Sequence, residues 1–280
     1  MLILLALAAV WLAVDLYYSN QVPQLTRTEV PLATLPAGFD GFRVAHLSDW
    51  HRKDFGTDGN TIFDLLKQEQ PDIIVLTGDF IDRTEHLDWA EDTLLRLKEI
   101  APTYFVTGNH EWGEDWRAAK LNTEPLTPHL RDVMDKLGVV WLDHSHRVLE
   151  RGGSSLVIAG FTDPNGPAYQ LDYAAQVQAI RDELDDPFIL LLCHRYDMLE
   201  TYTDLKISLT LAGHAHGGVV RLPFTDGLIG PGHDFLPKHT SGLTVSGDSV
   251  LAVSRGLGPT AVPRLFNRPQ VSLLTLRCGE

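Results

Sequence analysis

The sequence predicts an α/β fold with a largely parallel sheet and a functional site at one edge of that sheet. Short apolar segments alternate with longer segments of helical periodicity, which is the pattern of β-α-β units. Five of the apolar segments lead directly into Asp, Asn or His. Because the carboxyl ends of parallel strands meet at one edge of a sheet, we expect these polar side chains to gather there.

The first segment of the chain is almost wholly apolar and runs from Met1 to Val14, followed by Asp15 and then Tyr17 and Tyr18. A helix of about 18 residues is about 27 Å long, close to the ~30 Å hydrocarbon core of a bilayer. The segment lacks the basic start and the small-residue cleavage site of a signal peptide. We therefore expect residues 1–20 to form a membrane anchor helix, and the alternative is a buried helix of the soluble domain.

The rest of the chain divides into a connecting segment and one large domain. Residues 21–40 carry Pro23, Pro31 and Pro36, which favour a linker and an edge strand. Residues 41–280 contain no internal linker, so we expect a single domain there. Its first strands are expected at Arg43–Leu47, Ile73–Thr77 and Thr103–Thr107, its helices at Asn60–Glu69, Asp88–Ile100, Thr127–Gly138 and Tyr169–Leu184.

The second half of the domain is richer in strands. Gly152 and Gly153 separate two apolar runs and predict a β-hairpin. The strands expected here are Val139–Leu142, Val148–Glu150, Leu156–Gly160, Phe188–Cys193, Ile207–Ala212, Val219–Leu222, Leu243–Val245, Val250–Val253 and Val271–Leu276. Pro223–Ser241 is a long loop, and loops of this length in a compact domain are usually functional.

Composition excludes several classes of protein. The net charge is −14 and no dense run of Lys or Arg is present, so we expect no nucleic-acid binding. Cys193 and Cys278 lie far apart and form no Cys-x-x-Cys pair, which argues against a thiolate zinc site and a disulfide framework. At 44% hydrophobic residues, the chain is able to bury a sizeable core.

The polar residues after the strands form a set that suits metal binding. They are Asp49, His51, Asp79, Asn109, His194, His214 and His216. Mixed oxygen and nitrogen ligands of this kind suit Mn, Fe or Zn. Each pair alone is weak evidence, but seven such side chains at one sheet edge would be costly without a cation to compensate them. We place Asp79, at the end of the apolar run Ile73–Leu76, at the centre of the site.

The order of these motifs resembles that of the calcineurin-like metallophosphoesterases. The pattern is D-x-H, G-D-x-x-D, G-N-H-E, H and G-H-x-H, from Asp49 to His216. Ser254–Gly258 and Pro263–Pro269 resemble the bacterial membrane-associated branch with YkuE-like and YaeI-like phosphoesterases, so the likeness covers nearly everything after residue 40. It implies a four-layer αββα sandwich of two mixed β-sheets flanked by helices. Trp50 departs from the family pattern.

The resemblance also implies roles for individual residues. Three residues would hold one divalent metal ion: Asp49, His51 and His216. Three would hold the second: Asn109, His194 and His214. Asp79 would bridge the two ions. His110 would steady the phosphate or protonate the leaving oxygen, Asp82 would orient His110 with Glu111 as the weaker candidate for that task, and Asn109 would also contact a phosphate oxygen.

The implied function is a dinuclear phosphoesterase in which a metal-bridging hydroxide attacks a phosphomonoester, phosphodiester or pyrophosphate directly. Arg83, Trp112 and Phe235 are the candidate substrate-binding residues. One alternative is a UDP-2,3-diacylglucosamine pyrophosphatase-type hydrolase of lipid A synthesis, and another is a non-catalytic, metal-stabilised binding module. The complete ligand set favours the enzyme. A β-lactamase-like hydrolase would need a His-x-His-x-Asp-His run, which the chain lacks.

The expected partners follow from the anchor and the site. An anchored site works close to a bilayer, which favours a phosphorylated small molecule or lipid from the membrane or envelope as substrate. The amino end carries no acid and Asp15 follows the apolar run, which favours an extracytoplasmic catalytic domain. The sequence gives no indication of oligomeric state.

Overall fold

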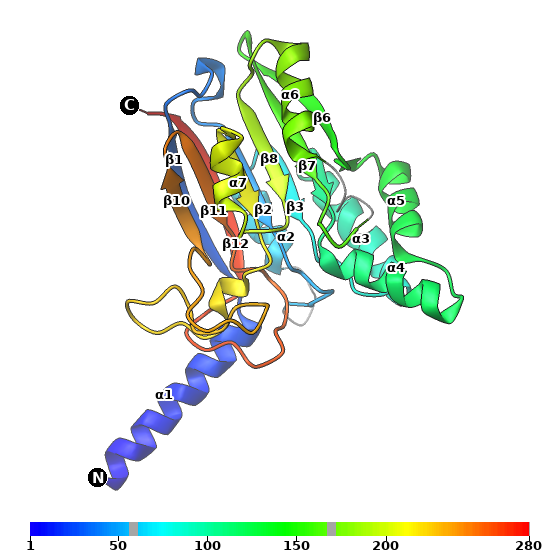
Figure 1. Ribbon diagram of the computed structural model, residues 1–280. Coiled ribbons are helices and arrows are strands. Elements are labelled where there is room, and N and C mark those ends of the chain that lie inside the picture. The colour runs from blue at the N-terminus through cyan, green and yellow to red at the C-terminus, as the bar shows by residue number, and fades with distance from the viewer. Residues whose placement is uncertain (56–60, 167–171, 280) are drawn as a thin grey trace.

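Two six-stranded β-sheets pack face to face at the centre of the molecule, and helices cover their outer faces (Figure 1). The computed structural model describes residues 1–55, 61–166 and 172–279. The strand order is β1-β12-β2-β3-β4-β5 in the first sheet and β10-β11-β9-β8-β7-β6 in the second. This is the expected α/β sandwich of two mixed sheets flanked by helices.

The first sheet is parallel from β2 to β5, while β12 runs antiparallel to β2 and parallel to β1. Its strands are β1 Gln24–Leu32, β2 Arg43–Leu47, β3 Ile73–Thr77, β4 Thr103–Val106, β5 Val140–Trp141 and β12 Gln270–Cys278. In the second sheet β7, β8, β9 and β11 are parallel, with β6 and β10 antiparallel at the edges. Its strands are β6 Ser145–Arg151, β7 Ser154–Phe161, β8 Ile189–Cys193, β9 Leu209–Ala212, β10 Gly242–Ser246 and β11 Ser249–Val253.

The core lies in three layers because each central strand is apolar on both faces. In β3, Ile73 and Val75 pack against the second sheet, whereas Ile74 and Leu76 face the helices of the first. Buried parallel strands read as continuous apolar runs for this reason. The first sheet is covered by α2 Thr61–Glu69, α3 Leu87–Lys98 and α5 Leu126–Leu137, and the second by α6 Tyr173–Leu184 and α7 Leu199–Asp204.

The structure differs from the sequence prediction at three places. Val219–Leu222 is not a strand: only Val220 pairs, with Leu265, because the positive φ of Val219 turns the chain there. The helix expected from Thr127 begins one residue earlier, at Leu126, after Pro125 at the N-cap position. Helix α4, Asn109–Leu121, was not predicted at all. Residues 167–171, at the expected start of α6, and residue 60 lie outside the described residues.

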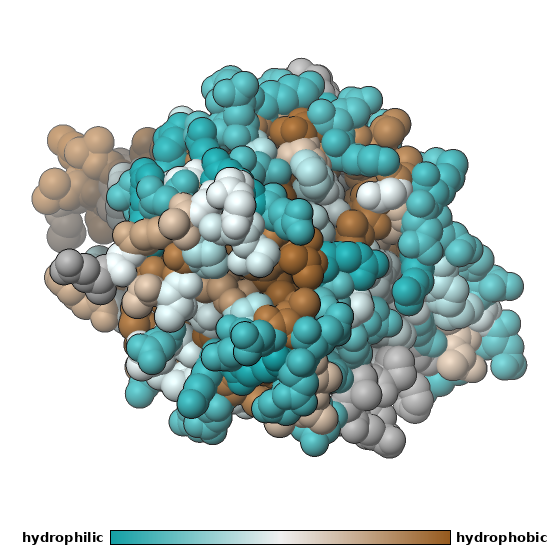
Figure 2. Space-filling view, turned by 90° about the horizontal axis from the view of Figure 1, so that it is seen from above, coloured by the Kyte–Doolittle hydropathy of each residue, from teal (hydrophilic) through white to brown (hydrophobic). Residues whose placement is uncertain are grey.

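The apolar N-terminal segment forms one helix, α1 Leu2–Gln21, which projects from the domain with its apolar side chains exposed (Figure 1). By length and composition it is able to cross a membrane. In Figure 2, which views the domain from the other end, the periphery of the domain is largely hydrophilic and the projecting helix forms the apolar group at the left. Helix and domain therefore present very different surfaces to their surroundings.

The last turns of α1 are bound to the domain through the segment 264–267. The Asp15 carboxylate accepts the N–H of Phe266 at 2.8 Å, and the Ser19 hydroxyl accepts that of Asn267 at 3.2 Å. Asn20 exchanges two hydrogen bonds with the backbone of Arg264, at 2.9 and 3.0 Å. Strand β1 begins only two residues after the helix ends. The helix is thus docked on the domain at its carboxyl end.

Candidate active site

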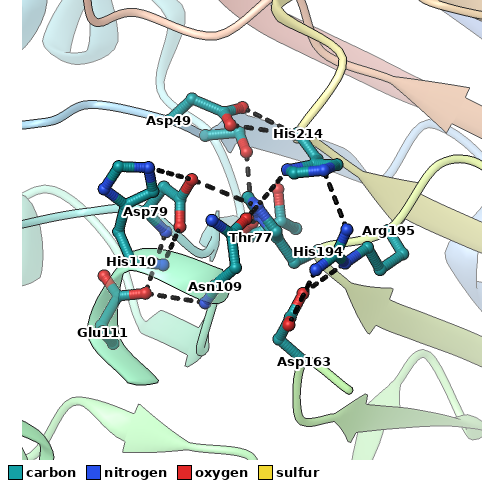
Figure 3. A network of polar contacts seen from close by, with 12 residues as sticks. Asp49, Thr77, Asp79, Asn109, His110, Glu111, Asp163, His194, Arg195 and His214 are labelled. Atoms are coloured by element: carbon teal, nitrogen blue, oxygen red, sulfur yellow. Dashed lines mark hydrogen bonds and ion pairs between the residues drawn. The ribbon is translucent and has the colours of Figure 1, made fainter. Parts of the chain in front are cut away.

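The predicted ligands meet where the carboxyl ends of the two sheets come together (Figure 3). Each side chain stands within a few residues of the carboxyl end of a strand, in a loop or, for Asn109, at the first residue of α4, so the strand ends position the site. Strands β2, β3, β4, β8 and β9 deliver them in order: Asp49 and His51, Asp79, Asn109, His194, and His214 with His216. The structure therefore brings all seven predicted ligands to one place.

Asp79 lies between two groups of nitrogen ligands. Its Oδ2 is 3.3 Å from Nε2 of His194 on one side and 3.7 Å from Nε2 of His51 on the other. Its Oδ1 accepts the backbone N–H of His110 at 2.9 Å, which fixes the carboxylate plane. The side chain is buried. A carboxylate oxygen close to imidazoles of both sets suits the bridging role that the resemblance implies for Asp79.

Three overlapping groups of possible ligand atoms surround this carboxylate, and in each group the atoms lie within 4.8 Å of one another. They are Asp49, His51 and His216; His51, Asp79 and His110; and Asp79, His194 and His214. We call the first and last groups the ligand clusters; Asn109 lies beside the last, because its Oδ1 is 3.1 Å from Nε2 of His194. The resemblance assigns these two clusters to two separate ions, and that assignment stays a prediction.

In His194 and His51, Nδ1 makes a hydrogen bond that orients the ring and leaves Nε2 facing the site. Nδ1–H of His194 donates to the carbonyl of Thr77 at 2.7 Å, so Nε2 is the nitrogen that faces Asp79. Burial lowers the pKa of His194, but the charge of Asp79 raises it to about 10, so Nε2 is protonated in the absence of a cation and a bound cation would displace that proton. His51 is held in the same way, since its Nδ1 lies 2.7 Å from the Asp82 carboxylate. Metal-binding histidines are usually oriented by such partners. Both rings therefore fit the role of ligand.

The backbone at the site is strained. Five of the predicted ligands have φ between 47° and 66°, in the left-handed region that such residues rarely adopt: Asp49, His51, Asp79, His214 and His216. Each such residue costs of the order of 1 kcal/mol or more. The close approach of neighbouring loops adds a second constraint, because a Cβ on Gly108 would collide with the Asp79 carboxylate. Strain concentrated at one place is characteristic of functional sites.

The electrostatics of the site favour bound cations. Burial raises the pKa of Asp49, and burial together with the charge of Asp79 raises that of Glu111 to about 7. Buried negative charge is therefore unfavourable in the protein alone, and a cation would offset it. Burial and the positive charges of His194 and Arg195 lower the pKa of His214 to about 2, so this ring is neutral, as a ligand must be. The donor set fits two divalent ions.

His110 faces solvent beside the clusters and is held by Asp82. Its Nδ1 lies 3.0 Å from Oδ1 of Asp82, the same oxygen that contacts His51. The hydrogen bond to Asp82 raises the pKa of His110 to about 9, so the ring is protonated at neutral pH. Its side chain is half exposed, at 47%. This geometry is what a proton donor at the mouth of a site needs.

Glu111, the weaker candidate for orienting His110, makes other contacts in the structure. It does not contact His110 through its carboxylate; instead it accepts the backbone N–H groups of Gly108 at 2.7 Å, Phe80 at 2.7 Å and Asp79 at 3.1 Å. The residue is buried at the start of α4. Glu111 therefore ties the loop after β3 to the loop after β4, and so supports Asp79 and Asn109 together.

Two arginines near the ligands were missed by sequence reasoning. Arg195 is bound by the buried Asp163 through two hydrogen bonds, of 2.6 and 3.1 Å, and its Nη1 lies 2.9 Å from Nε2 of His214 (Figure 3). Arg264 is fully buried, donates to the carbonyl of Arg255 at 2.7 Å, and lies 3.2 Å from Nδ1 of His216. The only local signals in the sequence were that Arg195 directly follows His194 and that Arg264 lies in the segment Pro263–Pro269.

Two cavities meet at His110. The larger, of about 540 Å³, runs from the ligand clusters to an apolar wall formed by Val219, Ile229, Pro231, Pro259, Ala261 and Val262. The smaller, of about 310 Å³, is lined by Asp82, Arg83, Asn109, His110, Gly113, Glu114 and Arg117. The site therefore has one apolar approach and one approach lined by charged side chains of both signs.

The three candidate substrate-binding residues differ in their positions relative to the two cavities. Arg83 lines the smaller cavity next to His110. Trp112 is not among the residues that line either cavity; its Nε1 donates to the hydroxyl of Thr107 at 2.9 Å, a packing role. Phe235 also lies outside the larger cavity, with 75% of its surface exposed, and Ile229 lines the cavity instead.

The chain belongs to the calcineurin-like phosphoesterase family, whose model matches residues 42–218. Members are metal-dependent phosphoric ester hydrolases. The metallophosphoesterase YkuE of Bacillus subtilis is 28% identical over 270 residues, covering 93% of this chain and 88% of that protein. The phosphodiesterase YaeI of Escherichia coli is 27% identical, covering 84% and 82%. A transmembrane protein with metallophosphoesterase domain from Danio rerio is 26% identical, covering 98% and 62%.

The position of Glu111 leads to a prediction about stability. Glu111→Ala removes the acceptor of three backbone N–H groups, those of Gly108, Phe80 and Asp79. We expect the free energy of unfolding of the metal-free protein to fall by about 1–3 kcal/mol, measured by urea denaturation in detergent at pH 6, below the pKa of about 7 of Glu111, where loss of a buried charge does not offset the lost hydrogen bonds. The exposed Glu85→Ala is the control and should change it by less than about 0.5 kcal/mol. Equal midpoints for both variants would show that Glu111 does not hold the loops.

Proposed function

We propose that this protein is a dinuclear metal-dependent phosphoesterase that acts on a membrane- or envelope-associated phosphoester. The observation that carries the proposal is the place of Asp79 Oδ2 between two sets of imidazoles. In this proposal Asp49, His51 and His216 hold one ion, and Asn109, His194 and His214 hold the other. When bound, two such ions activate a water molecule and neutralise charge on the phosphoryl oxygens. Mn, Fe and Zn all suit this donor set.

The remaining steps fall to side chains of the chain itself. His110, protonated and held by Asp82, donates its proton to the leaving oxygen from the side of the site that faces solvent. Asp82 is a positioning residue, since its carboxylate holds both His110 and His51. Asn109 sits where its amide reaches a phosphoryl oxygen, and Arg83 reaches the same group from the smaller cavity. These contacts orient the phosphorus relative to the acid.

The two cavities support a substrate with two unlike arms. A phosphodiester or pyrophosphate extends in both directions from its phosphorus, whereas a monoester fills only one. The apolar wall of Ile229, Pro231 and Val262 suits a hydrocarbon arm, and the side of Arg83 suits a polar arm. An amphiphilic phosphodiester or pyrophosphate satisfies both, and a nucleotide-linked diacyl sugar is one such pyrophosphate. The extracytoplasmic placement of the domain stays a prediction.

The first test concerns the metals. We expect the protein to hydrolyse bis-p-nitrophenyl phosphate with Mn²⁺ and to lose this activity on chelation. Asp79→Asn should lose bound metal and nearly all turnover, because a neutral amide bridges two cations poorly. Asp64→Asn, in α2, is the control. Elemental analysis that finds two ions per chain in an active Asp79→Asn protein would refute the assignment.

The second test concerns the proton donor. His110→Asn should keep both ions and lower kcat by about 10²- to 10⁴-fold for esters with a poor leaving group, the usual effect of losing a general acid. The loss should be smaller for p-nitrophenyl esters, whose leaving group needs little protonation. Kinetics with a series of leaving groups measure this difference. Equal losses across the series would argue against the role of His110 as acid.

The third test concerns the apolar wall. Ile229→Ala should raise KM for a long-chain phosphodiester by about 10-fold, because contact with the hydrocarbon arm is lost, at about 1.4 kcal/mol for each factor of ten. Turnover of bis-p-nitrophenyl phosphate should hardly change. Val245→Ala, exposed on β10, is the matched control. A similar rise in KM for both substrates would mean that Ile229 only supports the structure.

A further inference from the structure

A group of apolar side chains is exposed on the loops that contribute to the lining of the larger cavity. It consists of Leu222, Phe224, Phe235, Leu236 and Val262, which we call the apolar rim. Val262 and Ile229 line the cavity, and Ile229 forms a β-bridge with Phe235. Phe224 is fully exposed and Phe235 is 75% exposed. Among the described residues, these are the only phenylalanines exposed to that degree. Exposed apolar side chains that gather in one patch usually mark a contact surface.

One segment, 264–267, makes hydrogen bonds both to the start of the loop that carries the apolar rim and to the last turns of α1. Val220, two residues before Leu222, pairs with Leu265, and Arg221 N–H donates to the carbonyl of Leu265 at 3.0 Å. Asn267 donates to the carbonyl of Val219 at 3.0 Å. The same segment, 264–267, binds the last turns of α1. Figure 1 accordingly shows the loop that carries most of the rim beside the root of α1, at the end from which the helix leaves.

The docking of α1 fixes where a membrane would lie. The helix is continuous from Leu2 to Gln21, but its carboxyl half is bound to the domain through Asp15, Ser19 and Asn20, and Trp11 stacks on Phe266 at 5.0 Å. The part before Asp15 rises only about 20 Å, less than the ~30 Å of a hydrocarbon core. If α1 crosses a bilayer, the segment 264–267 therefore lies within the interface of the bilayer.

We infer that the apolar rim is a second membrane contact, which enters the interface of the bilayer beside α1 and holds the mouth of the larger cavity against the lipid. The inference rests on the proposed membrane anchoring. A lipid surface is the occupant that the structure favours, because the rim is continuous with a helix whose own exposed surface is apolar. Phenylalanine side chains on loops suit this interface, where apolar groups bury beneath the headgroups.

This contact would also serve the site. Val262 belongs both to the rim and to the cavity wall, and Ile229 and Pro231 lie in the loop between Phe224 and Phe235. A hydrocarbon arm would therefore pass from the bilayer to the cavity wall along apolar side chains, without crossing water. The phosphate at its other end would reach the ligand clusters that line the same cavity.

The test uses the full chain in vesicles of phosphatidylethanolamine and phosphatidylglycerol. In a Cys278→Ser background, a single cysteine replaces Phe224, Phe235 or, as control, the exposed Leu121 at the far end of α4, and each is labelled with an environment-sensitive fluorophore. Cys193 is fully buried, which protects it from labelling. We expect nitroxide-bearing lipids to quench the label by at least about twofold more at 224 and 235 than at 121.

Quenching at 224 and 235 that is no greater than at 121 would overturn the inference. A label at 224 that is shielded from water but not quenched by lipid, in a protein that runs as a dimer, would overturn it in favour of contact with a second copy. Turnover of bis-p-nitrophenyl phosphate with Mn²⁺ is measured on the unlabelled protein in the same vesicles. Turnover without quenching contradicts the membrane contact alone, while absence of turnover contradicts the proposed function.

Discussion

The site depends on one carboxylate, that of Asp79, held between imidazoles from both sheets. His51 comes from the end of β2 in the first sheet, and His194 comes from the end of β8 in the second. The two sheets must therefore pack in one register for the ligand sets to form. Burial raises the pKa of Asp79, but the charges of His194 and His51 lower it well below its ordinary value, so the carboxylate stays ionised. This balance explains why so many polar groups gather where two apolar strand layers end.

The strain at the ligands is compensated by a surrounding layer of hydrogen bonds. Glu111 ties the loops after β3 and β4, and the backbone carbonyls of His216 and Val219 accept from Asn267 at 2.8 and 3.0 Å. The N–H of Asn267 in turn donates to Ser19 of α1. Helix α1 and the loop after β9, which carries His214 and His216, therefore rest on the same short segment. A helix expected to serve only as a tether is part of the support of the site.

The sequence was informative where chemistry is local. Polar residues directly after apolar runs predicted the ligands, because strand ends in an α/β sheet share one edge, and the continuous apolar character of β3 and β8 predicted burial on both faces. The sequence did not predict contacts between residues that lie far apart along the chain. Asp163 and Arg195 are 32 residues apart, and nothing around either one indicates the pair. Helix α4 has a weak apolar stripe and contains Gly113, so its periodicity did not predict it. The exposure of Phe235 depends on how its loop folds back, which composition does not encode.

The central claim is that two cations share Asp79, and anomalous diffraction tests it most directly. Crystals grown with Mn²⁺ would be measured on both sides of the manganese absorption edge. We predict two anomalous peaks about 3.5–4 Å apart, one beside Asp49, His51 and His216, the other beside Asn109, His194 and His214, with Asp79 between them. A single peak, or peaks that do not contact Asp79, would contradict the account.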